Sequence, residues 1–90
     1  MEMTKTSDGV WFVYLLRCAD DSLYTGITTD VSRRRDQHNA GTASRYTRGR
    51  LPIRLVYEET ITSRSLALKR EATMKALSRM EKESLIKTAR

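Results

Sequence analysis

Two short runs of aromatic and branched residues, separated by four turn-forming residues, constrain the fold of this chain more than any other feature. The first run covers residues 10–18 and the second covers residues 23–28, while the four residues between them read Ala-Asp-Asp-Ser. Aromatic and β-branched residues favour strands, and Asp and Ser favour turns. The sequence therefore predicts a β-hairpin close to the N-terminus.

A helix and a basic connector are expected after the hairpin. Asp30 suits the N-cap of a helix over residues 31–40, because its carboxylate can accept a backbone N–H of the first turn. Gly41 stands where a left-handed residue commonly ends a helix. Residues 42–50 hold three arginines among small residues. They predict either a short helix or an exposed loop.

The second half of the chain predicts one strand and two helices. Pro52 precedes a third strand over residues 53–58, and a proline there suits a strand that starts at the margin of a sheet. Ser63 is the expected N-cap of the next helix, and Ser78 with Glu81 forms a capping box for the last helix. This order of elements predicts a small antiparallel sheet covered by helices.

Length and charge limit the range of functions. The 90 residues suffice for one small domain, so we expect a flexible tail over residues 1–9 and a single domain over residues 10–90. Seventeen Lys and Arg against eleven Asp and Glu give a net charge of +6 and a pI near 9.9. This excess favours a polyanionic partner, with nucleic acid foremost, although small basic domains also carry such charge for solubility alone.

The cysteine content and hydropathy predict the cellular setting. Cys18 is the only cysteine, so it cannot form an intrachain disulfide, and a reducing, cytoplasmic location is expected. The longest apolar stretch, residues 10–16, is much shorter than a membrane span, and no membrane partner is expected.

Arg34 and His38 are the first candidate site residues. They are four residues apart on the predicted helix, so they share one face. A guanidinium stays charged and offers a planar fork of donors, which suits a phosphoryl group whose charge is spread over several oxygens. The alternative is that Arg33, Arg34 and Arg35 form a solvated helix face and that His38 is an ordinary surface residue.

Two tyrosines of the hairpin form a second candidate group. Tyr14 and Tyr24 share a face of the sheet only if the numbers of paired residues sum to an even value. A tyrosine hydroxyl has a pKa of about 10, but a neighbouring arginine and a bound cation both favour the phenolate, so Tyr14 is a candidate proton acceptor for water. Packing of both tyrosines as ordinary strand residues is the alternative. Gly26 within the strand indicates a close approach of backbone or ligand.

Glu71 is the candidate metal ligand. A single carboxylate suits Mg²⁺, which keeps several waters and takes phosphate oxygens as further ligands. The alternative is an i,i+4 ion pair with Lys75. The sequence holds no cluster typical of zinc or two-metal sites, so we expect one Mg²⁺ or Mn²⁺ ion, weakly bound without substrate.

These residues together resemble the motif series of the GIY-YIG nuclease superfamily. The matching segments are residues 12–14 (Phe-Val-Tyr) and residues 24–26 (Tyr-Thr-Gly), followed by Arg34, His38 and Glu71. Phenylalanine replaces the glycine of the first motif and threonine replaces the isoleucine of the second. The stretch from residue 11 to about residue 86 resembles the small single-domain bacterial members.

The resemblance implies an α+β fold in which a three-stranded antiparallel sheet is flanked by helices, in the order β-β-α-α-β-α-α. It also implies metal-dependent hydrolysis of a phosphodiester. Tyr14 and Tyr24 would act in proton transfer and water positioning, and Arg34 would bind the scissile phosphate. His38 would support them, Gly26 would allow close packing, and Glu71 would bind the metal.

The resulting hypothesis is an endonuclease that cuts one strand at a time with a single Mg²⁺ or Mn²⁺. We expect DNA rather than RNA as the partner. The alternative is a nucleic-acid-binding or protein-interaction module that keeps the motif residues without significant turnover. The basic and aromatic residues expected to contact the nucleic-acid backbone and bases are Arg33, Arg35, Arg45, Tyr46, Arg48 and Arg50.

Overall fold

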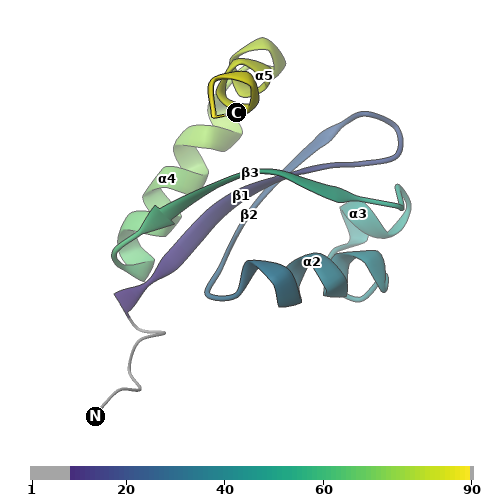
Figure 1. Cartoon of the computed structure of the whole chain (residues 1–90), viewed down its shortest axis with the longest axis horizontal. Helices are drawn as coiled ribbons and strands as arrows, with labels where there is room; N and C mark the ends of the chain where they lie inside the picture. Colours follow the sequence, from purple (N-terminus) through teal and green to yellow (C-terminus); the bar gives the residue numbers. More distant parts are fainter. Residues whose placement is uncertain (1–8, 90) are drawn as a thin grey trace.

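A three-stranded antiparallel sheet forms the centre of the computed structural model, which describes residues 9–89 (Figure 1). The strands are β1 (Trp11–Arg17), β2 (Leu23–Thr28) and β3 (Arg54–Ile61), and β1 lies in the middle of the order β2-β1-β3. Of the predicted N-terminal tail, residues 1–8 lie outside the described residues.

Four described helices complete the fold, and each begins after a Ser or Asp N-cap whose side chain accepts a backbone N–H of the first turn. The order β-β-α-α-β-α-α confirms the predicted α+β fold. No helix among residues 9–89 is long and apolar enough to span a bilayer. The helices are α2 (Val31–Asn39), α3 (Arg45–Arg48), α4 (Arg64–Ala76) and α5 (Arg79–Thr88).

β3 differs from its predicted extent, because it runs to Ile61 rather than ending at residue 58. The added residues pair with the first half of β1, where Ile61 lies opposite Trp11 and Glu59 lies opposite Val13. Pairing with the central strand therefore carries β3 through the two glutamates at 58 and 59 to the β-branched Thr60 and Ile61.

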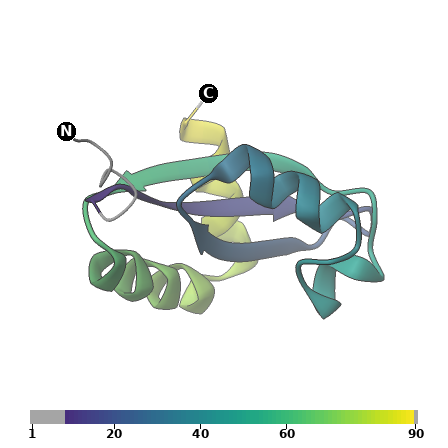
Figure 2. The same cartoon turned by 90° about the horizontal axis from the view of Figure 1, so that it is seen from below.

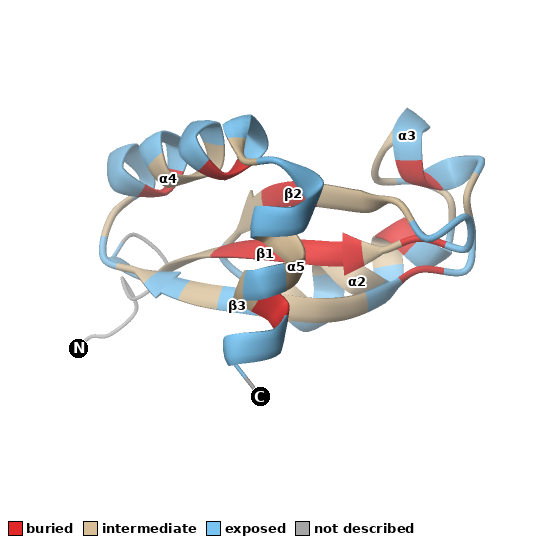
Figure 3. Ribbon diagram, turned by 90° about the horizontal axis from the view of Figure 1, so that it is seen from above, coloured by how far each residue is buried: buried red, intermediate tan, exposed pale blue. Residues whose placement is uncertain are grey.

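Helices cover both faces of the sheet: α2 and α3 lie on one face, and α4 and α5 lie toward the other (Figures 1 and 2). Alternate residues of β1 point to opposite faces. Val13 and Leu15 pack against Ala67 and Met74 of α4 and Ile86 of α5 in the main apolar core. Figure 3 shows α5 crossing in front of the buried centre of β1, with α4 to one side.

The other face of β1 carries the candidate tyrosine. Tyr14 and Leu16 belong to a second buried cluster, which includes Ile53. In the hairpin, Tyr14 lies opposite Gly26 and Leu16 lies opposite Tyr24. The paired numbers sum to an even value, so the two tyrosines share the face that α2 covers.

Two forked ion pairs fasten the C-terminal helices to the sheet. Arg17 of β1 donates to both carboxylate oxygens of Glu83 in α5 at 2.5 and 2.7 Å. Arg70 of α4 donates to both oxygens of Glu59 in β3 at 2.8 and 2.7 Å. Bidentate pairs of this kind fix orientation as well as distance. The Arg17 guanidinium lowers the pKa of Glu83 to about 2.

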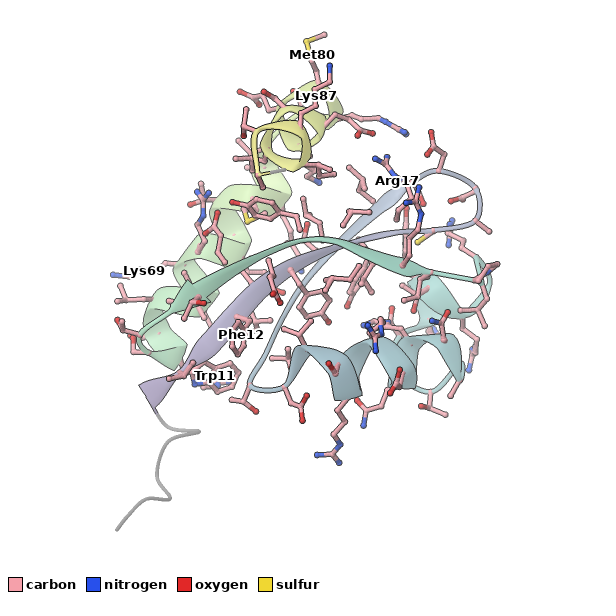
Figure 4. All side chains as sticks on the ribbon, in the orientation of Figure 1. Trp11, Phe12, Arg17, Lys69, Met80 and Lys87 are labelled. Atoms are coloured by element: carbon pink, nitrogen blue, oxygen red, sulfur yellow. The ribbon has the colours of Figure 1, made fainter. Side chains whose placement is uncertain are left out.

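We expect Met74→Ala to lower the free energy of unfolding by about 2–5 kcal/mol, because Met74 is fully buried and truncation leaves a cavity. Met80→Ala is the matched control: Met80 is 80% exposed and projects from α5 away from the sheet (Figure 4). Urea unfolding of both variants measures the two effects. Equal stability of the two variants would contradict the assignment of the core.

Candidate active site

A buried polar cluster lies between β1 and the helices α2 and α3. β1 contributes Tyr14, α2 contributes Arg34 and His38, and α3 contributes Thr47. Asp30 fixes the start of α2 by accepting the N–H of Arg33 at 3.0 Å. This start places Arg34 and His38 four residues apart, on the helix face that meets the sheet.

A chain of two hydrogen bonds runs through this cluster. The Tyr14 hydroxyl lies 3.1 Å from Nε2 of His38, and Nδ1 of His38 lies 2.7 Å from Oγ1 of Thr47. All three side chains are buried. The Tyr24 ring meets the His38 ring edge to face, with centroids 5.1 Å apart. His38 is therefore a buried, fully bonded residue, and the alternative of an ordinary surface histidine is wrong.

The proton on the His38 ring is assigned from the balance of donors and acceptors. Thr47 Oγ1 can donate to the Ser44 carbonyl, 3.4 Å away, and accept a proton from Nδ1. Nε2 then has a free lone pair for the Tyr14 O–H. In this arrangement Tyr14 donates to His38, and His38 donates to Thr47.

Burial shifts the pKa values of Tyr14 and His38 in opposite directions. Desolvation raises the pKa of Tyr14 to about 12, although the Arg34 guanidinium beside the hydroxyl opposes this rise. Desolvation and the charge of Arg34 lower the pKa of His38 to about 4. Both groups are therefore neutral near neutral pH. Arg34 lowers the pKa of Tyr14, the direction that we expected, but burial has the larger effect and the hydroxyl stays protonated.

Gly26 leaves the space that the Tyr14 hydroxyl occupies. A Cβ atom at residue 26 would lie 2.4 Å from the Tyr14 hydroxyl oxygen and 2.6 Å from Cζ of the ring. The close approach that the strand glycine predicts is thus an approach of this neighbouring side chain. Any larger residue at position 26 must displace Tyr14.

Arg34 has donors that the described part of the chain does not fully use. Its Nη1 donates to Gln37 at 3.0 Å, while its buried Nε has no hydrogen-bond partner within residues 9–89. No carboxylate of those residues forms an ion pair with it. An unpaired guanidinium at a partly buried position is suited to an anionic oxygen.

Glu71 lies on α4, which packs along the edge strand β2. Its charge raises the pKa of Tyr14, so the carboxylate acts on the same region. Lys75 contacts it at 3.5 Å, as the ion-pair alternative expects, and the carboxylate keeps about 20% of its surface exposed. No group of three or more His, Cys, Asp or Glu among residues 9–89 can hold a metal. One carboxylate fits only a hydrated Mg²⁺ or Mn²⁺ that takes its remaining ligands from water and substrate.

The residues expected to contact nucleic acid differ in their contacts: some are held by neighbouring side chains, and others are exposed. The Tyr46 ring lies 5.9 Å from Tyr24, and the Arg50 guanidinium lies 4.0 Å above the Tyr46 ring. Arg50 also pairs with Asp20 at 2.9 Å, and Arg35 contacts Asp36 at 3.5 Å. Among the residues expected to contact nucleic acid, Arg33, Arg45 and Arg48 are exposed and form no ion pair within residues 9–89.

Two hollows differ in their relation to the cluster. The larger, about 610 Å³, lies between β3 and α5 and is lined by Arg17, Arg54 and Met80 among others. The smaller, about 320 Å³, is lined by Arg34 and by Trp11. Only the smaller hollow adjoins the candidate residues.

Thr47 is the site residue that sequence reasoning missed. It lies in a run of arginines and small polar residues, where nothing local separates a buried threonine from an exposed one. Its role follows from the short helix α3, whose Ser44 cap accepts from the N–H groups of Tyr46 and Thr47. The capping pattern around Ser44 is the one signal that could have suggested an ordered helix there.

Gly26→Ala is expected to lower the free energy of unfolding by about 1–3 kcal/mol, because the added Cβ must displace Tyr14. Gly49→Ala is the control, since a Cβ at Gly49 meets no atom within 4 Å and the backbone there has a negative φ. Urea unfolding compares the variants. If Gly26→Ala is as stable as Gly49→Ala, the close packing on Tyr14 is wrong.

His38 should make the protein less stable as the pH falls. The unfolded chain takes up a proton near pH 6.5, whereas the folded chain keeps His38 neutral until about pH 4. Stability is therefore complete above the unfolded pKa and decreases below it, by on the order of 1 kcal/mol between about pH 7 and about pH 5. Carboxylates with lowered pKa values, such as Glu59 and Glu83, titrate below this window.

Urea unfolding of the wild type and His38→Gln at about pH 7 and about pH 5 checks this expectation. The wild type should lose more stability on acidification than the variant does. An equal loss in both proteins would show that His38 titrates normally in the folded state.

Comparison with known proteins agrees with this geometry. Residues 10–84 match the model of the GIY-YIG catalytic domain. A UPF0213 protein of Desulfotalea psychrophila is 47% identical over 90 residues, covering 99% of this chain and 82% of the relative. A UPF0213 protein of Natronomonas pharaonis is 52% identical over 75 residues, covering 83% of this chain and 88% of the relative.

Two solution structures are also similar. A protein of E. faecalis superimposes with a TM-score of 0.60 at 40% identity, covering 98% of this chain and 90% of that chain. A UPF0213 protein of Bacillus halodurans superimposes with a TM-score of 0.57 at 46% identity, covering 88% and 84%. The chain therefore belongs to the GIY-YIG catalytic domain family.

Proposed function

We propose that the protein is a divalent-metal-dependent endonuclease that hydrolyses phosphodiester bonds of nucleic acid. The observation that carries this proposal is the buried Tyr14–His38 pair beside Arg34, a cation with no carboxylate partner within residues 9–89. A guanidinium binds phosphate, and the adjacent pair can accept a proton. Membership of the GIY-YIG nuclease superfamily supports the same chemistry.

Arg34 binds the scissile phosphate and stabilises the charge that develops on its oxygens. The Tyr14 hydroxyl takes a proton from the attacking water while its own proton passes to Nε2 of His38, 3.1 Å away. As the water oxygen bonds to phosphorus, the bond from phosphorus to the leaving sugar oxygen breaks, and that oxygen takes a proton from solvent water. The transfer between Tyr14 and His38 avoids a free phenolate, which the pKa of about 12 disfavours. Thr47 holds the imidazole in the orientation that leaves Nε2 as the acceptor.

Glu71 would hold the metal, and Tyr24 would position the water. A bound Mg²⁺ or Mn²⁺ would supply positive charge for the phosphate oxygens. Tyr24 fits its role because it shares the face of Tyr14 and packs on His38. The Glu71 carboxylate fits its role because its oxygens are partly exposed and oxygen is the ligand that these cations prefer.

The basic surface supports nucleic acid as the partner. Exposed Arg33, Arg45 and Arg48 would contact neighbouring phosphates, and Tyr46 would stack on a base. Arg35 and Arg50 contribute positive charge while contacting Asp36 and Asp20. We expect DNA in preference to RNA, and a cytoplasmic protein.

A plasmid-nicking assay with Mg²⁺ tests the proposal. Tyr14→Phe and Arg34→Ala are each expected to reduce the nicking rate by about 10²-fold or more, because each removes one group that acts in the transition state. Glu71→Gln should reduce the rate and weaken its dependence on Mg²⁺. Lys69→Ala removes a charge from an exposed position on α4 and should keep the wild-type rate (Figure 4).

Equal residual nicking in all four variants would point to a contaminating nuclease and would refute the enzyme. The raised pKa of Tyr14 favours, in that case, a nucleic-acid-binding module without turnover. A binder of this kind would lose oligonucleotide affinity steeply with salt, because its arginines displace counterions from phosphates. Affinity that does not change with salt would indicate a protein-interaction module instead.

A further inference from the structure

The hollow beside Arg34 has an aromatic wall. It lies where the start of β1, the end of β2 and the first turns of α2 meet, and its volume is about 320 Å³. That volume is within the range of small-ligand sites. Figure 4 shows Trp11 at the start of β1, next to the turn from β2 into α2. The other residues lining the hollow are Ile27, Thr28, Thr29, Asp30, Arg33, Arg34 and Gln37. The Asp30 carboxylate already accepts the N–H of Arg33, so the hollow also holds one acidic group at the start of α2.

Trp11 packs on the apolar core and also lines the hollow. It is partly buried and packs against the core formed by Val13 and Leu15. The Arg64 guanidinium of α4 lies 5.8 Å from the centre of its ring. Trp11 lines the hollow together with Arg33 and Arg34 of α2. A flat aromatic surface among cations is suited to a flat, electron-rich group that carries phosphate.

Arg34 connects the hollow to the candidate active site. It lines the hollow together with Trp11, and its charge also acts on Tyr14 and His38. A phosphate bound to Arg34 therefore has the hollow on one side and the Tyr14–His38 pair on the other. In a nucleic acid, the base nearest to that phosphate is the group that can reach the hollow.

We propose that this hollow is a nucleobase subsite, in which the base next to the scissile phosphate stacks on Trp11. The inference rests on the proposed function of Arg34. A base can stack on a side chain only after it has left its neighbours in the strand. The subsite therefore selects an unpaired nucleotide at the cleavage position, in DNA or RNA, over a base held in a duplex.

The fluorescence of Trp11 reports on the subsite directly, because it is the only tryptophan in the chain. Titration in EDTA, which prevents metal-dependent cleavage, uses a single-stranded DNA oligonucleotide, an RNA of the same sequence and a blunt-ended duplex of equal phosphate number. We expect the single strands to quench the emission and the duplex to leave it nearly unchanged. Unchanged emission at saturating single strand, with binding confirmed by anisotropy, would overturn the proposal.

Substitution of Trp11 gives an independent measurement through the anisotropy of a labelled single strand. Trp11→Ala should weaken binding by about 5- to 150-fold, the range for loss of one stacked base. Trp11→Phe keeps an aromatic ring and should lose less, and Met80→Ala, on α5, should bind as the wild type does. Wild-type affinity in Trp11→Phe and Trp11→Ala alike would also overturn it. If Trp11→Ala does not fold, Trp11→Phe and the wild-type fluorescence still decide the question.

These measurements separate the subsite from the proposed reaction. Quenching by single strands in a protein that never nicks DNA supports the subsite and refutes the nuclease. Nicking that depends on Arg34, without quenching of Trp11, supports the nuclease and refutes the subsite. The RNA and DNA arms show which sugar the subsite accepts.

Discussion

The hydrogen bond between Tyr14 and His38 is the interaction on which the rest of the site depends. It joins the central strand to α2 between buried side chains, where an unpaired hydroxyl or imidazole would cost about 1–3 kcal/mol. Gly26 leaves room for the hydroxyl, and Thr47 bonds the other side of the imidazole. Losing any of these residues leaves a buried polar group without a partner or moves one out of place.

The two faces of the sheet divide stability and chemistry between them. On the α4 and α5 side, Val13, Leu15 and Met74 form an apolar core whose stability comes from burial. On the α2 and α3 side, Tyr14 and His38 are polar groups whose burial is tolerated because both are hydrogen-bonded. β1 supplies both sets by simple alternation. The apolar face thus stabilises the position of the strand, while the polar face carries the two groups that can exchange protons, Tyr14 and His38.

Local sequence patterns predicted most of the fold because local interactions determine it. The hairpin was predicted from its turn and its two strands. Tyr14 and Tyr24 could share a face of it in one of two possible registers, and the register of β1 with β2 is the one that does so. Asp30 caps its helix as expected, and Gly41 has the left-handed backbone that ends it. The extension of β3 was missed because two charged residues, Glu58 and Glu59, interrupt the apolar run although the β-branched Thr60 and Ile61 follow them, and pairing with β1 carries the strand through.

The candidate site was only partly predictable, for a related reason. Helical spacing is enough to place Arg34 and His38 on one face, whereas the sequence left two parities open for the tyrosines and the register of β1 with β2 decides between them. The partner of the imidazole, Thr47, comes from a helix of four residues, and only the tertiary fold brings it near. The pKa of Tyr14 depends on how deeply the ring is buried, which no spacing in the sequence reveals.

Substrate binding should change the pKa values of Tyr14 and His38, which are both neutral in the free protein. In the free protein, the charge of Arg34 lowers the pKa of both His38 and Tyr14, while burial acts on each in the direction that keeps it neutral. A phosphate bound to Arg34 offsets that positive charge. Both pKa values then rise, so the imidazole becomes a stronger proton acceptor while the Tyr14 hydroxyl holds its own proton more tightly. In the proposed relay, Tyr14 gains a proton from water as it gives one to His38 and stays neutral, so the basicity of His38 governs the transfer. Phosphate binding at Arg34 therefore favours this relay, whereas it disfavours a free Tyr14 phenolate.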